Sequence, residues 1–306
     1  MGLAFQLIKE SRDNMNKLVS QSNAFLWRKN EMNPVLANIL EARKETDLVQ
    51  INQEDAMKLY EDSLVDSDLL YNDFVIVDEI EGDWAKVVVP SQQSFQDERG
   101  YPGWMLLSDL EDTDKTSDTG EKIAVVVPKA EITYENGETR TVSFGTLFTK
   151  IAETDDSYTI ETPHGLATVL RNQVDLQHKQ GDNIGVNVVQ MAMQFLDLPY
   201  VWAGISSAGF DCSGFAFTLY RTCGKYIGRD ATEQSFTGKK IDYANAEPGD
   251  LLFFAYEEGK GEVHHVGVYI GNDEMIHSQT PGSKVILTKI AGSKYEPELC
   301  VTSRHR

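Results

Sequence analysis

The sequence is poor in cysteine. Its 306 residues include only three cysteines, Cys212, Cys223 and Cys300. So low and odd a count excludes a disulfide framework of the kind that holds small secreted domains together. Cys212 and Cys223 lie about three turns apart in one expected helix, which is too far for a bond between them. We therefore expect free thiols, as is typical of a reducing compartment.

Basic residues and long apolar runs are also scarce. Lys+Arg number 28 against 48 Asp+Glu, a net charge of −20, which argues against nucleic acid and anionic membranes as partners. The longest apolar runs, such as 123–127 and 251–255, are too short to span a bilayer. The first ten residues lack the basic and apolar segments of a secretory signal. We expect a monomeric cytoplasmic protein, with an envelope location left open if a signal has been removed.

The length predicts two to four domains. Residues 1–60 contain apolar positions at helical spacing, and Asn33-Pro34 suits a helix start, so we predict an N-terminal helical segment that packs on the next module. Short strands with turns between them follow at 61–112 and again at 120–178, where Asn136-Gly137 is a hairpin signal. We interpret these two stretches as two small all-β barrels of one kind.

From residue 184 the pattern becomes α+β. An amphipathic helix is expected over 186–196, and a second helix begins at Cys212 and ends before Gly224. Several strand-like segments follow between Leu251 and Thr288. Helices followed by strands with short turns indicate an antiparallel sheet that is covered by helices on one side.

Cys212 and two histidines in this region predict thiol chemistry. Cys212 stands in the first turn of its helix, where the partial positive charge of free N–H groups lowers a thiol pKa. His265 lies on one expected strand, and His277 on the next strand falls diagonally across from it on the same face, with Gly267 leaving room for the ring. We predict Cys212 as nucleophile, His265 as general base and His277 as the residue that orients it.

The same residues also permit interpretations without thiol catalysis. A lone cysteine is more often a small buried residue, and His277 could be a core histidine with satisfied hydrogen bonds. Cys212, His265 and His277 could also hold zinc, but the sequence has no close ligand pair such as Cys-x-x-Cys. We expect neither a metal nor an organic cofactor.

The segment Phe210–Phe215 resembles the nucleophile motif of the NlpC/P60 family of cysteine peptidases, and His265-Val266-Gly267 with His277 resembles its base and third residue. The resemblance covers about residues 184–306 and implies an α+β papain-like catalytic domain. The two barrels resemble bacterial SH3-like (SH3b) modules, on their strand pattern and Gly103-Trp104.

The whole layout is similar to that of family members that act as γ-D-glutamyl-L-diamino acid endopeptidases. That resemblance implies cleavage of murein peptides with a free N-terminal L-Ala, in cell-wall recycling or turnover. It also implies that residues of the catalytic domain line the D-Glu and L-Ala pockets and that two residues of the first barrel reach the substrate ammonium. The residues of the first group are Tyr200, Trp202, Ser213, Asp230 and His264, and those of the second are Asp73 and Tyr101. The subfamily often has Glu where Asp73 is placed.

Two other classes of function compete with a peptidase. One is a cell-wall binding protein with a vestigial or differently specific amidase domain, against which the intact Cys/His/His set argues. The other is an acyltransferase that uses the same thiol on lipid, which would need an apolar groove or a membrane-active helix that the sequence does not show. Reactivity of Cys212 towards an alkylating reagent would separate the first of these from an enzyme.

Overall fold

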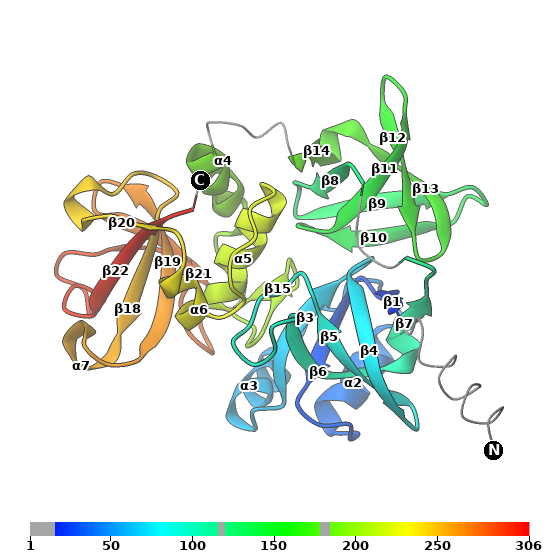
Figure 1. Ribbon diagram of the computed structural model, residues 1–306, viewed down its shortest axis with the longest axis horizontal. Coiled ribbons are helices and arrows are strands. Elements are labelled where there is room, and N and C mark those ends of the chain that lie inside the picture. The colour runs from blue at the N-terminus through cyan, green and yellow to red at the C-terminus, as the bar shows by residue number, and fades with distance from the viewer. Residues whose placement is uncertain (1–15, 116–119, 178–183, 306) are drawn as a thin grey trace, which may run out of the picture.

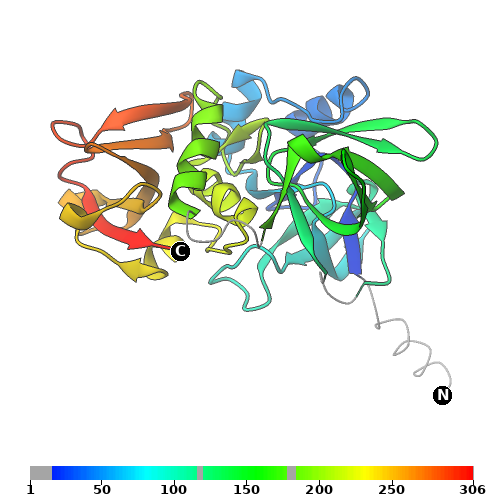
Figure 2. The same ribbon diagram turned by 90° about the horizontal axis from the view of Figure 1, so that it is seen from above.

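The computed structural model describes residues 16–115, 120–177 and 184–305. Figures 1 and 2 show two β modules next to each other and a C-terminal domain, whose helices α4 and α5 lie between its own sheet and the modules. In these ranges, no helix has both the length and the apolar character needed to cross a bilayer.

The first module is a seven-stranded antiparallel sheet in the order β3-β2-β6-β5-β4-β1-β7. Its core consists of apolar side chains from nearly every strand, among them Val19, Leu26, Val75 and Met105, all buried. The strands are β1 (Asn16–Val19), β2 (Asn23–Trp27), β3 (Val65–Leu70), β4 (Phe74–Glu81), β5 (Trp84–Val89), β6 (Tyr101–Leu106) and β7 (Leu110–Asp112).

The predicted N-terminal helical segment is wrong in its first part, because β1 and β2 are strands of the first module, which therefore begins well before residue 61. All five residues of β2 are buried, so the strand lacks the alternation that marks a half-exposed strand in a sequence. The predicted helices do occur, as α2 (Pro34–Ala42) and α3 (Gln53–Glu61). They form an insertion between β2 and β3. Residues 1–15 lie outside the described residues.

The second module repeats the topology of the first, strand for strand, in the order β10-β9-β13-β12-β11-β8-β14. It differs at the connection that corresponds to the helical insertion, where a short turn over 135–138 joins β9 to β10, with Gly137 at φ 85°. The hairpin predicted from Asn136-Gly137 is confirmed. The strands are β8 (Lys122–Val125), β9 (Lys129–Tyr134), β10 (Thr139–Ser143), β11 (Leu147–Glu153), β12 (Ser157–Thr162), β13 (Gly165–Leu170) and β14 (Val174–Leu176).

The C-terminal domain has a six-stranded antiparallel sheet in the order β17-β22-β18-β19-β20-β21, with helices packed on one face as predicted. A two-stranded ribbon of β15 (Ile205–Ser206) and β16 (Gly209–Phe210) leads into α5. The remaining elements are α4 (Ile184–Ala192), α5 (Cys212–Thr222), α6 (Ala231–Phe236), α7 (Tyr256–Gly259), β17 (Lys239–Lys240), β18 (Leu251–Ala255), β19 (Val263–Gly271), β20 (Glu274–Ser278), β21 (Val285–Lys289) and β22 (Leu299–Arg304).

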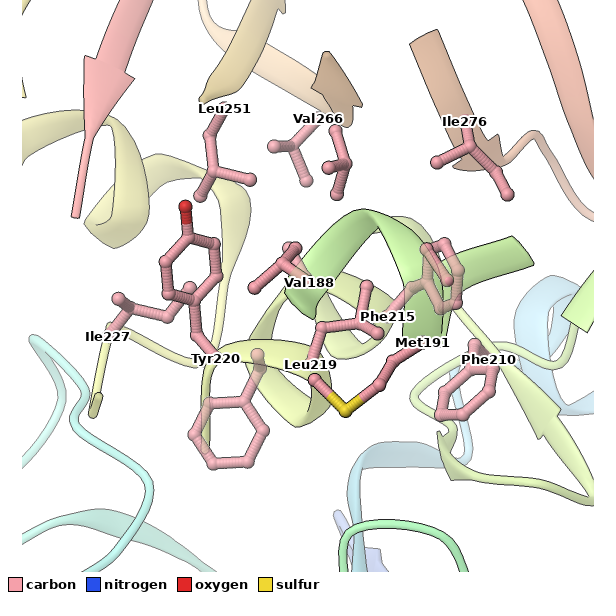
Figure 3. Packing of buried hydrophobic residues seen from close by; sticks show 14 of the residues in the cluster. Val188, Met191, Phe210, Phe215, Leu219, Tyr220, Ile227, Leu251, Val266 and Ile276 are labelled. Carbon is pink, nitrogen blue, oxygen red and sulfur yellow. The ribbon is translucent and has the colours of Figure 1, made fainter. Parts of the chain in front are cut away.

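Helix α5 is held against the sheet by a continuous apolar cluster. Figure 3 shows Phe215 and Leu219 of α5 beside Val188 of α4, beneath Val266 and Ile276 of the sheet. Each side chain of this size stabilises the fold by about 1.5–3 kcal/mol when fully buried. This packing fixes where the N-terminus of α5, and with it Cys212, meets β19.

Candidate active site

The start of α5 is fixed by a buried carboxylate and a buried guanidinium. Asp211 is the N-cap residue, and its side chain accepts a hydrogen bond from Gly214 N at 2.5 Å. Arg229 donates to Asp211 Oδ2 at 2.8 Å and to Ser67 Oγ of the first module at 2.8 Å. Because Arg229 is fully buried and paired, it ties the first turn of α5 to β3. The Cys212 thiol therefore has a fixed position.

His265 and His277 lie in contact, as the strand pattern predicts. The β19–β20 register pairs Tyr269 with Met275, and His265 Nε2 lies 2.6 Å from His277 Nδ1. His277 Nε2 in turn lies 2.8 Å from Thr288 Oγ1 on β21. If His265 donates from Nε2 to His277, and His277 donates to Thr288, the Nδ1 atom of His265 carries a free lone pair. That is the tautomer a general base needs.

The surroundings of the two rings keep them in place. Gly267 leaves room beside the rings: a Cβ atom there would meet Met275 Sδ, near the end of a flexible side chain, and would lie 3.4 Å from His277 Cβ. The ring of Tyr295 stacks on His265 with centroids 5.2 Å apart. Two imidazole nitrogens that face each other at hydrogen-bond distance do not converge on one ion. In the described part of the chain, no three His, Cys, Asp or Glu residues are grouped as metal ligands.

Burial controls the protonation of the reacting pair. It raises the pKa of the Cys212 thiol to about 12, with a smaller contribution from the Asp211 carboxylate, against the opposing effect of the Val266 and Ser213 N–H groups. The expected lowering by the helix start is therefore outweighed by burial. Burial and the adjacent His277 hold the pKa of His265 well below its usual range. Without substrate, the pair is thus a neutral thiol and a neutral imidazole.

The pair opens into a cleft of about 450 Å³ between the C-terminal domain and the first module. That volume suits a small peptide. His277 is fully buried behind His265 and does not line the cleft. Most of the residues predicted for the site do line it, namely Cys212, His265, Tyr200, Trp202, Ser213, Asp230, His264 and Tyr101.

Asp73 was predicted to reach the substrate amine, and this prediction is wrong. Its side chain is buried, forms an ion pair with Arg221 near the C-terminal end of α5 and accepts a hydrogen bond from Leu70 N at 2.9 Å. Arg221 is nine residues along the helix from Cys212, a rise of about 13 Å. Asp73 therefore holds the first module to α5 and stays away from the cleft.

The first module instead supplies Tyr101 and three residues that the sequence analysis missed. Tyr101 Oη donates to Asp230 Oδ2 at 2.9 Å across the boundary between the two parts. Asp66 of β3 also lines the cleft, and its carboxylate lies 2.5 Å from Arg28 Nε. Tyr60 of α3 packs on Trp202 with ring centroids 5.0 Å apart. Nothing in the sequence separates Asp66 from the buried Asp68 of the same strand; in the structure, Asp66 is the residue of Val65–Leu70 that is not fully buried.

Burial also affects the acidic end of the cleft. It raises the pKa of Asp230 to about 6, with a smaller opposing effect of Arg229. Asp230 remains mostly ionised at pH 7. Tyr101, whose own pKa is raised by burial and by Asp230, stays protonated and can donate to that carboxylate. This end of the cleft thus presents carboxylates and a phenol, a set that suits an ammonium group.

A second group of cleft residues comes from the C-terminal domain alone and has a different character. His264 stacks on Tyr256 with ring centroids 4.1 Å apart, and its Nε2 atom lies 3.3 Å from Glu298 Oε2. Lys294 and Gln279 also line the cleft there, near Tyr295. His264 was predicted, whereas Gln279, Lys294 and Tyr295 escaped the sequence analysis, because they come from loops whose positions depend on tertiary packing.

A thiol at a helix start that shares a cleft with an imidazole, which a second imidazole orients, is typical of a thiol-dependent hydrolase. Residues 197–304 match the NlpC/P60 family. The chain is 37% identical over 259 residues to the gamma-D-glutamyl-L-lysine dipeptidyl-peptidase of Bacillus subtilis (strain 168), covering 84% of this chain and 86% of that protein. The protein of the same name from Bacillus cereus is 38% identical over 219 residues, 69% of this chain and 66% of that protein.

A solved structure agrees over nearly the full length. The crystal structure of an NlpC/P60 family protein from Bacillus cereus superposes with a TM-score of 0.85 at 30% identity, covering 95% of this chain and 99% of that one. The chain belongs to the NlpC/P60 family of cysteine peptidases, as its motifs predicted.

Proposed function

We propose that this protein is a cysteine endopeptidase that hydrolyses the γ-D-glutamyl-L-diamino acid bond of murein peptides carrying a free N-terminal L-Ala. Its products would be the L-Ala-γ-D-Glu dipeptide and a peptide or amino acid that begins with the diamino acid. Two relatives that share most of this chain's length carry the name gamma-D-glutamyl-L-lysine dipeptidyl-peptidase, which supports the proposal.

The observation that carries the proposal is the position of the first module. Asp66 and Tyr101 of that module share one cleft with Cys212 and His265 of the C-terminal domain. A wall on that side limits how far a peptide can extend beyond the thiol, and its carboxylates favour a peptide end that is an ammonium. Trp202 supplies the apolar surface that an alanine methyl group requires.

The proposed reaction starts from the neutral thiol of Cys212 and the neutral imidazole of His265. The Cys212 thiol passes its proton to His265 Nδ1 as sulfur attacks the γ-carbonyl carbon of D-Glu. His265, held by His277, then protonates the leaving nitrogen, so the C–N bond breaks and a thioester remains. A water molecule, deprotonated by His265, attacks the thioester and regenerates the thiol. We assign stabilisation of the oxyanion to the backbone N–H of Cys212, at the start of α5, and to Tyr200, which lines the same cleft.

Product analysis tests the proposal directly. L-Ala-γ-D-Glu-L-Lys, its meso-diaminopimelate counterpart and N-acetylated versions of both are incubated with the enzyme and analysed by mass spectrometry. Release of L-Ala-γ-D-Glu from the free-amine peptides alone is the expected result. Cleavage of the N-acetylated peptides as well would show that the first module does not select for a free N-terminal ammonium. Turnover by Cys212→Ala would end the mechanism, and an unreactive Cys212 without any cleavage would favour a binding protein.

We further propose that both β modules are SH3-like and that the protein acts as a monomer on peptides recycled in the cytoplasm. Their shared strand order supports a common module type. All three cysteines are free, which is compatible with a reducing compartment. Fractionation of cells that express the protein, together with light scattering of the purified chain, would test these two points.

A further inference from the structure

We propose that Lys294 binds the α-carboxylate of the diamino acid, so that the enzyme prefers peptides in which this residue is the C-terminal one. The inference rests on the proposed function and deepens it, because it defines the length of the substrate on the leaving-group side of Cys212.

Lys294 lines the cleft on the Tyr295 side of His265. Its ammonium lies 5.0 Å from the ring centroid of Tyr295, and that ring stacks on His265. Burial and the imidazoles of His277 and His264 are the larger causes of the low pKa of His265, and the Lys294 ammonium is a smaller one. The pKa of His277 is lowered mainly by burial and to a smaller extent by Lys294. Asp230, in contrast, interacts with Tyr101 and Arg229. Lys294 and Asp230 thus have different neighbours within the cleft: Lys294 lies against Tyr295 beside His265, and Asp230 lies against Tyr101.

Lys294 also differs in its partners from two other basic residues of the cleft, Arg28 and His264. Arg28 pairs with Asp66, and His264 lies against Glu298. For Lys294, within the described ranges, the structure shows a ring contact but neither an ion pair nor a hydrogen bond to protein. In a chain of net charge −20, an exposed lysine that faces a cleft without a carboxylate partner is available for an anion from the substrate.

The chemistry of the leaving group identifies that anion. His265 must protonate the leaving nitrogen, so this atom lies beside the imidazole during the reaction. The α-carbon of the diamino acid is bonded to that nitrogen and carries the α-carboxylate. When the diamino acid is C-terminal, its α-carboxylate is an anion close to His265, on the side where Tyr295 and Lys294 lie. In a longer peptide it is a neutral amide, and the ion pair with Lys294 cannot form.

The experiment compares L-Ala-γ-D-Glu-L-Lys as free acid with its C-terminal amide. We expect the native enzyme to cleave the acid with a kcat/KM at least about tenfold higher, the size of a charge-assisted hydrogen bond. Lys294→Met should bring the two substrates within about twofold, and Lys294→Glu should favour the amide. Lys225→Met, which removes an exposed lysine beyond the far end of α5, is the matched control and should keep the native preference.

Using the ratio of two substrates keeps the test independent of other effects of Lys294. Any change that the substitution causes in the pKa of His265 applies to both peptides alike. Equal cleavage of acid and amide by the native enzyme, or an unchanged preference in both Lys294 variants, would overturn the inference while leaving the proposed function intact. Failure to cleave either peptide would instead count against the proposed function. A preference that appears only with meso-diaminopimelate would move the lysine's partner to the side-chain carboxylate and would likewise overturn the inference.

Discussion

The two β modules share one strand order but differ in what they do for the site. In the first module the connection between its second and third strands contains α2 and α3, whereas the second module makes the same connection with a turn over 135–138. The insertion contributes Tyr60 to the cleft, and it packs with Val201 and Ala203 in one apolar cluster. One connection therefore turns a repeated sheet into part of a substrate site.

The second module acts as a brace. No residue of β8–β14 lines the cleft, as far as residues 120–177 are described. Its contacts with the C-terminal domain include Phe144 against Phe195, with ring centroids 4.9 Å apart, and Ser143 Oγ at 3.0 Å from Ser207 Oγ. The first module is instead held by the buried Asp73–Arg221 ion pair. The modules thus differ both in function and in the physics of their attachment.

The largest effect is expected from breaking the anchor of the first module. Asp73→Ala removes a carboxylate from a buried guanidinium, and we expect the free energy of unfolding to fall by about 3–5 kcal/mol. Asp78→Ala, which breaks the partly exposed pair with Arg99, is the control and should cost less than about 1 kcal/mol. Urea unfolding followed by circular dichroism measures both. Equal losses would show that the buried pair is not an anchor.

The second largest effect is expected from a tyrosine of the first module, and it tests whether this module alone contributes to substrate binding. Tyr101→Phe removes the donor to Asp230, and we expect kcat/KM for free-amine peptides to fall about 10- to 100-fold, mainly through KM. Tyr158 in the second module also has a hydroxyl in a hydrogen bond, accepted from Arg171 Nη1 at 2.7 Å. Tyr158→Phe should stay within about twofold of the native enzyme. A comparable loss of kcat/KM in both variants would show that the two modules do not differ in their contribution to substrate binding.

The sequence predicted the contact between His265 and His277 because it depends on local geometry. His265 and His277 lie on consecutive strands joined by a tight turn, so alternation and register suffice to place them together. The start of α5 at Cys212 was also predicted, and the structure shows Asp211 as its N-cap residue. The two modules were also separable, since each consists of short strands bounded by turns.

Features that depend on docking could not be predicted. Asp73 and Asp66 are both acidic residues at or near β3, and only the packing of the module on α5 shows that one is an anchor and the other faces the cleft. Strand β2 was missed because complete burial removes its alternation. Arg229 was visible in the sequence, but its bonds to Asp211 and Ser67 join segments far apart in the chain.

The pH dependence should reflect the acidic end of the cleft. Because burial raises the pKa of Asp230 to about 6, this carboxylate loses its charge as the pH falls through 6, and ammonium binding weakens. Above about pH 8 the substrate α-amino group loses its proton, with the same consequence. We expect kcat/KM for free-amine peptides to fall on both sides of this range.

The origin of the acid limb can be assigned by substitution. The pKa of His265 lies well below its usual range, so this base does not titrate near pH 6. Asp230→Asn should therefore lower kcat/KM and abolish the limb near pH 6, whereas Glu138→Gln, at the turn of the second module, should leave the profile unchanged. An acid limb that persists in Asp230→Asn would assign it to another group.

The smallest effect is expected at the attachment of the second module. Ser143 Oγ accepts a hydrogen bond from Ser207 N at 2.8 Å, and Ser207 Oγ also donates to Pro128 O at 2.5 Å. Ser143→Ala should lower the free energy of unfolding by about 1 kcal/mol, the net contribution of one hydrogen bond. Because neither Ser143 nor Ser207 lines the cleft, kcat and KM should not change. A fall in kcat/KM in a fully folded Ser143→Ala protein would mean that the second module helps to shape the site, and the contrast between a functional module and a brace would no longer hold.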